Sequence, residues 1–325
     1  MGNIKKIILF VFLILVNFKT GLAQFDLTLV DYLNSPIMHN PAYVGVTDSY
    51  FFKATYSTQW VGFDGAPNTQ TIDLQHHFND EKNAVGISIL NDEFGAIRNT
   101  NIEINYAFHT RISNTSQLAL GIKAGLNNLA VDYNLLDIYD PTEYIYQDSG
   151  ISEPIPLIGI GFYYYFDNFW LSVSVPNLIQ KRIKELDEDI FRDAYRQRSH
   201  GYFGFGYNFY INRSFELKTQ FLGQISRGAP IGTLFNFDLE YDQKYSFGLH
   251  IDPSSLFGFS TGIDVYDKFR LSYGYNFSFN ELNKYSNGNH NIGISYYIEG
   301  SRRSAGNAAN YRPGHMRDRK PYIMR

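Results

Sequence analysis

The stretch FGFGYNFY, residues 203–210, places an aromatic ring at every second position. Successive side chains of an extended strand point to opposite faces, so these rings share one face, and the glycines and asparagine lie on the other. RLSYGYNFSF at 270–279 and LFNFDLEY at 234–241 repeat the pattern, with charged residues only on the second face. A strand whose outer face contacts water would have charged residues at the positions where these strands have aromatic residues. We therefore expect the ring face to meet lipid and the polar face to line a lumen.

The composition agrees with this interpretation. Aromatic residues make up 17% of the 325 residues, with 26 Tyr and 27 Phe, yet the mean hydropathy is only −0.26. A membrane barrel explains both values, because each strand shows one face to lipid and the other to a wet lumen.

Fourteen segments keep the period of two, an even number, as expected for a single-chain bacterial outer-membrane barrel. The sequence therefore predicts an all-β fold, a transmembrane antiparallel β-barrel over residues 50–300. The expected strands are 50–60, 69–79, 83–91, 99–112, 116–132, 155–166, 168–176, 198–211, 213–224, 232–242, 244–252, 255–266, 268–281 and 288–299.

The connections between these segments alternate in length. Every second one is short and polar, as in NDEK at 79–82 and SNTS at 113–116, whereas the others are longer on the whole, as in VGFDGAPN at 61–68. Outer-membrane barrels have short periplasmic turns and longer extracellular loops, while a soluble β-sandwich predicts no such alternation. We expect both chain ends in the periplasm.

The first 23 residues have the form of an export signal. Lys5 and Lys6 precede an apolar run at 7–16 and a small-residue cleavage site, so the mature chain is expected to start at Gln24. The sequence contains no cysteine, which excludes disulfides, cysteine metal sites and a lipoprotein anchor. These features predict export to a Gram-negative outer membrane.

No arrangement of residues predicts catalysis, a metal site or a cofactor. His76 and His77 are neighbours on an expected strand and would point to opposite faces, which prevents them from chelating one ion as a pair. Asp92 and Glu93 at a loop edge lack a partner at a spacing suited to acid–base chemistry. We expect no enzyme, and nucleic acid is an implausible partner in this compartment.

Residues 24–49 precede the first strand and include NSPIMHNPAYVG at 34–45, which is too apolar for a solvated linker and too rich in proline for a strand. We expect this segment to plug the periplasmic mouth or the lumen. The candidate plug residues are Asn34, Pro36, His39, Asn40, Pro41 and Tyr43. The expected lumen charges, which would pair with one another or with the plug, are Glu103, Lys123, Glu216, Lys218, Asp238, Glu240 and Asp264.

Two further segments carry charge. Residues 177–199 have helical spacing of apolar residues and could cap the extracellular mouth or dock a partner. Residues 301–325 carry a net charge of +6, against −13 for 24–300. The basic residues of this tail are Arg302, Arg303, Arg312, Arg317, Arg319, Lys320 and Arg325. We expect the tail to be disordered alone, either as a solvated end or as a tether to acidic periplasmic or lipoprotein machinery.

Several motifs resemble the PorP/SprF family. They are NPAYVG at 40–45, WVGFDGAPNTQTIDL at 60–74, GISILNDEFGAIRNTNIEINYAFH at 86–109, SVPNL at 174–178, GAPIGTLFNFDLEYDQKYSFGL at 228–249 and KYSNGNHNIGISYYI at 284–298. The resemblance covers most of 30–299 and implies an outer-membrane component of the Bacteroidetes type IX secretion and gliding apparatus. Such proteins hold secreted surface proteins, such as adhesins, through their C-terminal secretion domains. The final YYI and the basic tail depart from the family pattern, so the resemblance does not distinguish a cargo-associated member from one joined to the periplasmic apparatus.

If this protein also holds secreted surface proteins, its first outward-facing loop is the candidate site of cargo contact. Its residues are Trp60, Gly62, Phe63, Asp64, Gly65 and Pro67. A Trp/Phe pair on a stiff loop is a good apolar anchor, although Trp60 would fit equally in an aromatic girdle at the membrane interface. The rival functions are a transport channel for a small or hydrophobic nutrient and a purely structural link to the periplasm.

Overall fold

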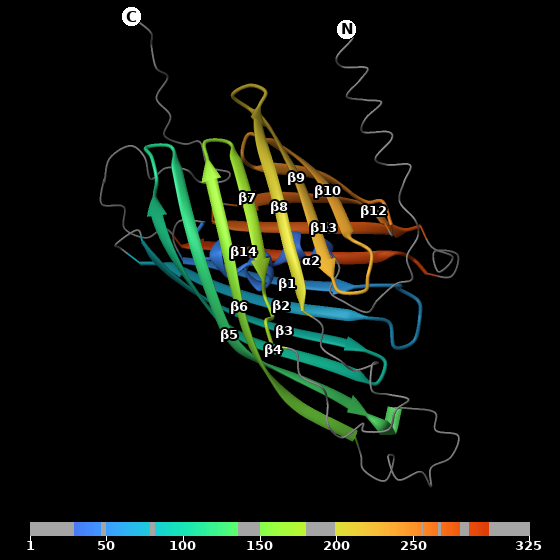
Figure 1. The fold of residues 1–325 in the computed structure, drawn as a ribbon. Coiled ribbons are helices and arrows are strands. Elements are labelled where there is room, and N and C mark those ends of the chain that lie inside the picture. Colours follow the sequence, from blue (N-terminus) through green and yellow to red (C-terminus); the bar gives the residue numbers. More distant parts are fainter. Residues whose placement is uncertain are drawn as a thin grey trace, which may run out of the picture.

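Fourteen antiparallel strands close into a barrel in the computed structural model of the chain (Figure 1). The structure describes residues 29–46, 50–78, 82–135, 150–179, 199–254, 256–265, 268–279 and 286–298. Each strand pairs with its neighbours in sequence, and β1 pairs with β14 to complete the wall. The predicted fold is confirmed. The signal peptide, the basic tail and nearly all of the loop 177–199 lie outside the described residues.

The strands follow the predicted segments closely. They are β1 (Tyr50–Thr58), β2 (Asn68–His77), β3 (Asn83–Phe94), β4 (Ile97–Arg111), β5 (Ser116–Asp132), β6 (Gly150–Phe166), β7 (Phe169–Val175), β8 (His200–Tyr210), β9 (Phe215–Ser226), β10 (Gly232–Tyr241), β11 (Tyr245–Asp252), β12 (Leu256–Val265), β13 (Phe269–Ser278) and β14 (Asn289–Ile298).

The two faces of each strand differ as the alternation predicts. On β8 the outward rings of Phe205 and Phe209 are about half exposed, whereas the intervening Asn208 is buried. On β4 the outward Ile104 is 62% exposed, while Glu103 beside it is 3% exposed. The outer surface is therefore apolar and the charges point inward, which is the arrangement that a lipid environment requires.

The connections divide the barrel into two ends. The turn end carries the connections 78–82, 112–115, 167–168, 211–214, 242–244 and 266–268, and the loop end carries 59–67, 95–96, 133–149, 176–199, 227–231, 253–255 and 279–288. One connection at the loop end is shorter than predicted, because β3 and β4 extend to a two-residue turn in which Gly95 has a positive φ of 54°. Asp92 and Glu93 consequently lie in strand β3 rather than at a loop edge.

Strand β6 begins five residues earlier than predicted, and its added part includes Pro154. The Ile158 carbonyl points toward the β7 side and accepts a hydrogen bond from Leu178 N. Backbone groups at every second position of a strand point the same way, so the N–H groups that Pro154 and Pro156 lack would also have pointed to that side. Pairing between β6 and β7 ends at Ile160, so no described strand needs those two donors. Figure 1 shows β5 and β6 extending past the ends of β7 and β8 at the loop end.

Residues 29–46 fold inside the barrel as three short helical pieces, drawn in blue within the wall in Figure 1. They are α2 (Leu29–Asn34), α3 (Pro36–His39) and the 3₁₀ turn η1 (Pro41–Tyr43). Pro36 and Pro41 each stand at the start of a piece, where the missing N–H costs no hydrogen bond. None of the described helices is long and apolar enough to cross a bilayer.

Candidate functional site: the lumen segment and the outer rim

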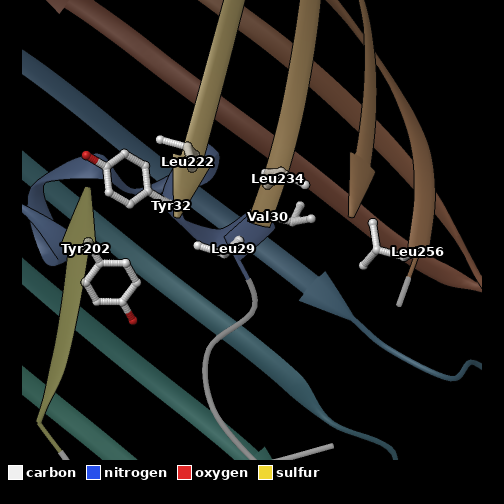
Figure 2. Close-up of a cluster of buried hydrophobic side chains, with 7 residues drawn as sticks. All are labelled: Leu29, Val30, Tyr32, Tyr202, Leu222, Leu234 and Leu256. Atoms are coloured by element: carbon white, nitrogen blue, oxygen red, sulfur yellow. The ribbon is translucent and has the colours of Figure 1, made fainter. Parts of the chain in front are cut away.

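The lumen segment, residues 29–46, has its first turn at the loop end of the barrel. Leu29, Val30 and Tyr32 of α2 form a buried cluster with four wall residues, shown in Figure 2. These wall residues lie near the loop ends of their strands and are Tyr202 of β8, Leu222 of β9, Leu234 of β10 and Leu256 of β12. The start of the segment is therefore held by apolar packing.

The last residues of the segment lie at the turn end. The backbone N–H of Gly45 donates to Gln75 Oε1 of β2 at 3.0 Å, and His109 Nε2 of β4 donates to the Val44 carbonyl at 2.7 Å. Gly45 has a positive φ of 78° and lies so close to His77 and Ala84 that a Cβ would be 2.7 Å and 2.4 Å from their atoms. The segment thus runs through the lumen from the loop end to the turn end.

Polar side chains anchor the middle of the segment. Asn40 Nδ2 donates to the Phe162 carbonyl of β6 at 3.0 Å and to Ser172 Oγ of β7 at 2.8 Å, while its Oδ1 accepts from Ala42 N at 2.9 Å. Ser174 of β7 donates to the His39 carbonyl at 2.6 Å. A buried amide with this many partners costs little to bury and fixes the segment in one position.

Two wall glycines make this close approach possible. A Cβ on Gly121 of β5 would lie 2.1 Å from Ala42 N, and one on Gly161 of β6 would lie 1.9 Å from Asn40 Oδ1. These distances are far below a van der Waals contact, so any larger residue would push the segment away from the wall.

A buried ion pair joins the wall to the segment. Lys123 Nζ of β5 lies 2.6 Å from Glu103 Oε2 of β4 and donates to the Met38 carbonyl at 2.6 Å. Both charged side chains are almost completely buried, with 2% and 4% of their side-chain surface exposed. An ion pair that is this well shielded from water is stable only while both charged partners are present, because an unpaired buried charge is costly.

Further lumen charges pair along the turn end of β9 to β13. Lys218 Nζ lies 2.7 Å from Glu240 Oε1, and Arg270 reaches Asp264 at 3.2 Å and Glu240 at 3.8 Å. Asp238 accepts from the neutral Asn236 Nδ2 at 2.5 Å. The predicted internal pairing of lumen charges is thus observed for Lys218, Glu240 and Asp264.

The structure places the predicted segment residues and adds two others. Pro36, His39, Asn40, Pro41 and Tyr43 all lie against the wall or within the segment's own turns, and Asn34 ends α2. Sequence reasoning missed Tyr32 and Ser35, whose hydroxyls reach Ser172 at 2.9 Å and Asp73 Oδ2 at 2.5 Å. The three short helical turns repeat no apolar period, so the sequence offered no signal for these partners.

Burial shifts the titration of the segment's side chains. It lowers the pKa of His39 to about 4, against the ordinary 6.5, because the charged imidazolium cannot be solvated there. Burial raises the pKa of Tyr43 to about 12 and raises that of Tyr32 as well. All three side chains are therefore neutral near pH 7, and His39 can donate from Nδ1 to the Ser35 carbonyl at 3.1 Å.

The outer-rim loop, residues 59–67, is held on both sides. On one side Val61 N donates to the Gly288 carbonyl at 3.1 Å, and Asn287 N donates to the Val61 carbonyl at 2.8 Å. On the other side Gly95 N donates to the Gly65 carbonyl at 3.0 Å. The loop therefore bridges the β3–β4 turn and the last connection of the barrel.

The residues of this loop divide into an anchored base and an exposed tip. Trp60 lies two residues beyond the end of β1 and has a positive φ of 48°. Its backbone N–H donates to Asn289 Oδ1 at 2.9 Å, and its ring centroid lies 6.2 Å from that of Phe94. Pro67 is buried. The exposed residues of the tip are Gly62, Phe63, Asp64 and Gly65, with 39% of Phe63 exposed.

The two adjacent histidines do face opposite ways. The ring of His77 lies 5.2 Å from that of His109 inside the barrel, whereas the ring of His76 lies 5.2 Å from that of Phe78. Among the described residues no group of three His, Cys, Asp or Glu side chains is arranged to hold a metal ion.

The chain is similar, at low sequence identity, to several solved structures. A Pseudomonas aeruginosa FadL homologue aligns with 10% identity and a TM-score of 0.48 over 82% of this chain and 94% of its own. The monoaromatic hydrocarbon channel CymD aligns with 9% identity and a TM-score of 0.49 over 88% and 96%. The P. putida toluene transporter TodX aligns with 9% identity and a TM-score of 0.45 over 82% and 94%. No curated protein matches the chain.

The sequence profile of one family, described as type IX secretion system membrane protein PorP/SprF, matches residues 21–296. That range includes the lumen segment and the barrel as far as Tyr296 of β14. In other outer-membrane barrels the short connections face the periplasm and the longer loops face outward. The chain belongs to the PorP/SprF family of type IX secretion system outer-membrane proteins.

Proposed function

We propose that this protein binds or anchors secreted surface proteins, such as adhesins, at the outer rim of a closed barrel. The observation that carries the proposal is the outer-rim loop, residues 59–67, whose backbone is fixed on two sides while the Phe63 ring stays exposed. A loop that is already ordered loses little entropy on binding, and an exposed ring on a rigid support is a typical interface anchor.

The lumen segment supports an anchor more than an open channel. Ile37, Val44 and Asn40 are buried at 2% exposure or less, and the segment contacts β2 to β10 and β12 through apolar and polar groups. We infer that it acts as a plug. The rival function, passage of a small or hydrophobic nutrient, would require the segment to move aside.

The basic tail fits a second attachment on the periplasmic side. β14 ends at Ile298, at the turn end of the barrel. If the short turns face the periplasm, as in other outer-membrane barrels, the basic residues that follow would be within reach of periplasmic proteins. Arg302, Arg303, Arg312, Arg317, Arg319 and Lys320 would bind an acidic component of the secretion apparatus, such as a lipoprotein or a periplasmic ring. Purification with and without 301–325 tests this link: an identical set of co-purifying periplasmic proteins would exclude it.

The rim contact is tested with Phe63→Ala and with the Phe63→Ala/Asp64→Ala double variant. Their matched control is Ile231→Ala, which removes a 55% exposed apolar side chain from another loop-end connection. In gentle detergent, the rim variants are expected to lose the co-purifying secreted protein, and cells are expected to lose it from their surface. The control should retain both.

Barrel folding is checked in the same samples by heat-modifiable migration on gels. Normal folding with unchanged cargo in the double variant would reject the rim as the contact. Flux of a small solute through the unaltered protein would instead favour the channel.

A further inference from the structure

Three aromatic residues form a row across the turn end of β6, β7 and β8, which are neighbours in the wall (Figure 1). Phe166 is the cross-strand partner of Phe169, and Phe169 is in turn the partner of Tyr207. Partners that lie opposite one another in a sheet share a face, and Phe166 and Tyr207 are 43% and 42% exposed. The row therefore lies on the outer, lipid-facing surface of the barrel.

A cleft of about 550 Å³ lies beside this row. Its lining consists of the three aromatic residues and the two residues of the β6–β7 turn, Asp167 and Asn168. The N–H of Asp167 donates to the Thr115 carbonyl of the neighbouring turn at 3.1 Å. The Asn168 carbonyl accepts from Asn208 N at 2.9 Å. The turn is thus held on both sides, and the charged residue that it contributes to the cleft is a carboxylate.

The cleft lies where the outer surface changes from apolar to polar. Toward the middle of the wall the outward residues Leu171, Val173 and Phe205 are exposed and apolar. Beyond the row come the polar turns at 113–115, 167–168 and 212–214. Aromatic residues are typical of this depth, where hydrocarbon meets the head groups of the bilayer. A molecule that fills the cleft therefore has to combine an apolar chain with a polar head group, as a membrane lipid does.

A second aromatic row at the turn end shows which charge such a place accepts. Its cross-strand partners on β9, β10 and β11 are Phe215, Tyr241 and Tyr245. The Lys244 ammonium lies 5.5 Å from the centroid of the Tyr245 ring, within the range of a cation–π contact.

The turns beside the two rows are alike in their backbone. Asp167 and Asp242 have positive φ angles of 46° and 49°. Like Asp167, Asp242 donates its N–H to a carbonyl of the preceding turn, that of Ser214, at 2.7 Å. The turn at 242–244 contains a lysine, whereas the turn at 167–168 contains only aspartate and asparagine. The first row therefore has the rings and the carboxylate for a cation that its own turn does not supply.

We propose that the cleft at Phe166, Phe169 and Tyr207 binds the ammonium head group of phosphatidylethanolamine. The ammonium would lie against the rings, as Lys244 does in the second row, and would donate to the Asp167 carboxylate. The acyl chains would follow the apolar outer face of β6 to β8. In outer-membrane barrels the short turns face the periplasm, so the lipid would come from the periplasmic leaflet.

The chemistry of the cleft selects among the common head groups. A primary ammonium can donate to the carboxylate, whereas the quaternary ammonium of phosphatidylcholine has no N–H to donate. The anionic head group of phosphatidylglycerol would be repelled by Asp167. The outer-rim loop lies at the other end of the barrel, so this site is independent of which protein the rim binds.

Native mass spectrometry of the purified, full-length protein tests the site. The protein in detergent is equilibrated with equal amounts of phosphatidylethanolamine and phosphatidylglycerol that have the same acyl chains, and the ratio of the two bound lipids is measured. Asp167→Asn removes the charge and retains a residue type that tolerates a positive φ. Phe169→Leu removes a ring and keeps an apolar side chain. Asp242→Asn is the matched control, because it makes the same change in the second turn.

The unaltered protein is expected to retain more phosphatidylethanolamine than phosphatidylglycerol. Asp167→Asn and Phe169→Leu are each expected to lower the ratio by about two- to fivefold, the factor that an exposed cation–π contact supplies. Asp242→Asn should leave the ratio unchanged. Heat-modifiable migration on gels, measured in the same samples, shows that each barrel has folded.

Three results would overturn the proposal. The first is an equal retention of the two lipids by the unaltered protein, and the second is an unchanged ratio in both Asp167→Asn and Phe169→Leu. The third is an equal fall of the ratio in Asp242→Asn, since the loss of any carboxylate at this depth would then be sufficient. If phosphatidylcholine is retained as well as phosphatidylethanolamine, the assignment to a primary ammonium is wrong.

Discussion

At the scale of single residues, the position of the lumen segment depends on wall residues that have no side chain. Gly121 and Gly161 provide the space that Ala42 and Asn40 occupy. Alternation in the sequence predicts that these glycines face inward, but it cannot show which of the inward glycines the segment touches. That information depends on the path of residues 29–46 through the lumen.

Gly121→Ala is expected to weaken the segment's attachment and to lower the free energy of unfolding by about 1–3 kcal/mol, as overpacking does. Gly274→Ala is the matched control, because its added Cβ would meet no atom closer than 3.6 Å. Urea unfolding in detergent micelles measures both. Equal losses in the two variants would mean that proximity to the segment is irrelevant.

Lys123 supports a second residue-scale prediction. Lys123→Met leaves the Glu103 carboxylate buried without its partner, which costs about 3–5 kcal/mol of unfolding free energy. Adding Glu103→Gln to Lys123→Met should recover most of that loss, since the unpaired charge is then gone. A double variant as unstable as Lys123→Met would show that the hydrogen bond to Met38, rather than the charge, is what matters.

At the scale of elements, period-two alternation predicted the strands because each wall strand has one lipid face and one lumen face over its whole length. The same reasoning did not predict the start of β6 or the helical pieces inside the barrel. The start of β6 was predicted five residues too late, and Pro154 is accommodated there because this part of the strand lacks a partner on the β7 side. The helical pieces at Leu29–Asn34 and Pro36–His39 were missed. They are buried on several sides, so their apolar residues do not follow a helical period.

The α3 turn makes the segment sensitive to acid. His39 has a pKa of about 4 when packed and an ordinary value of 6.5 when released, so a released segment binds a proton that the packed one does not. Attachment is therefore unaffected above pH 6.5 and weakens as the pH falls from 6.5 to 4, by about 3 kcal/mol over the whole interval. The groups that face His39 include Lys123 and His200, and both further disfavour its charged form.

Unfolding midpoints between pH 7.5 and pH 4.5 measure this effect in the unaltered protein and in His39→Gln. The glutamine variant should show a flatter dependence, whatever its stability at pH 7.5, because the other histidines are retained. Parallel curves for the two proteins would assign the acid sensitivity to another group.

At the scale of the whole molecule, the sequence predicted a barrel with a segment in its periplasmic mouth or its lumen, and in the structure residues 29–46 lie inside the lumen between the loop end and the turn end. The outer-rim loop was also located in advance, from Trp60 to Pro67, although its fixation by Asn287 and Gly95 was not, because those contacts join three connections that are distant in sequence. Local patterns carry information on faces and turns, whereas contacts between connections arise only when the wall closes.

Deletion of residues 34–45 is expected to raise the sensitivity of cells to large antibiotics, since the lumen loses the segment that fills it. The amount of heat-modifiable barrel in the outer membrane is measured alongside, to separate leakage from loss of the protein. Unchanged sensitivity with normal barrel levels would contradict a plugging role.

The seam between β1 and β14 has a consequence for biogenesis. These strands are the first and last of the chain, and they pair along their whole length, from Tyr50 opposite Ile298 to Thr58 opposite His290. The cylinder cannot be sealed until the final strand has been delivered, and an edge left open in hydrocarbon is too costly to persist. Residues 29–46 come shortly before β1 and lie within the cylinder that this seam closes, so we expect sealing of the wall and enclosure of the segment to be coupled during assembly.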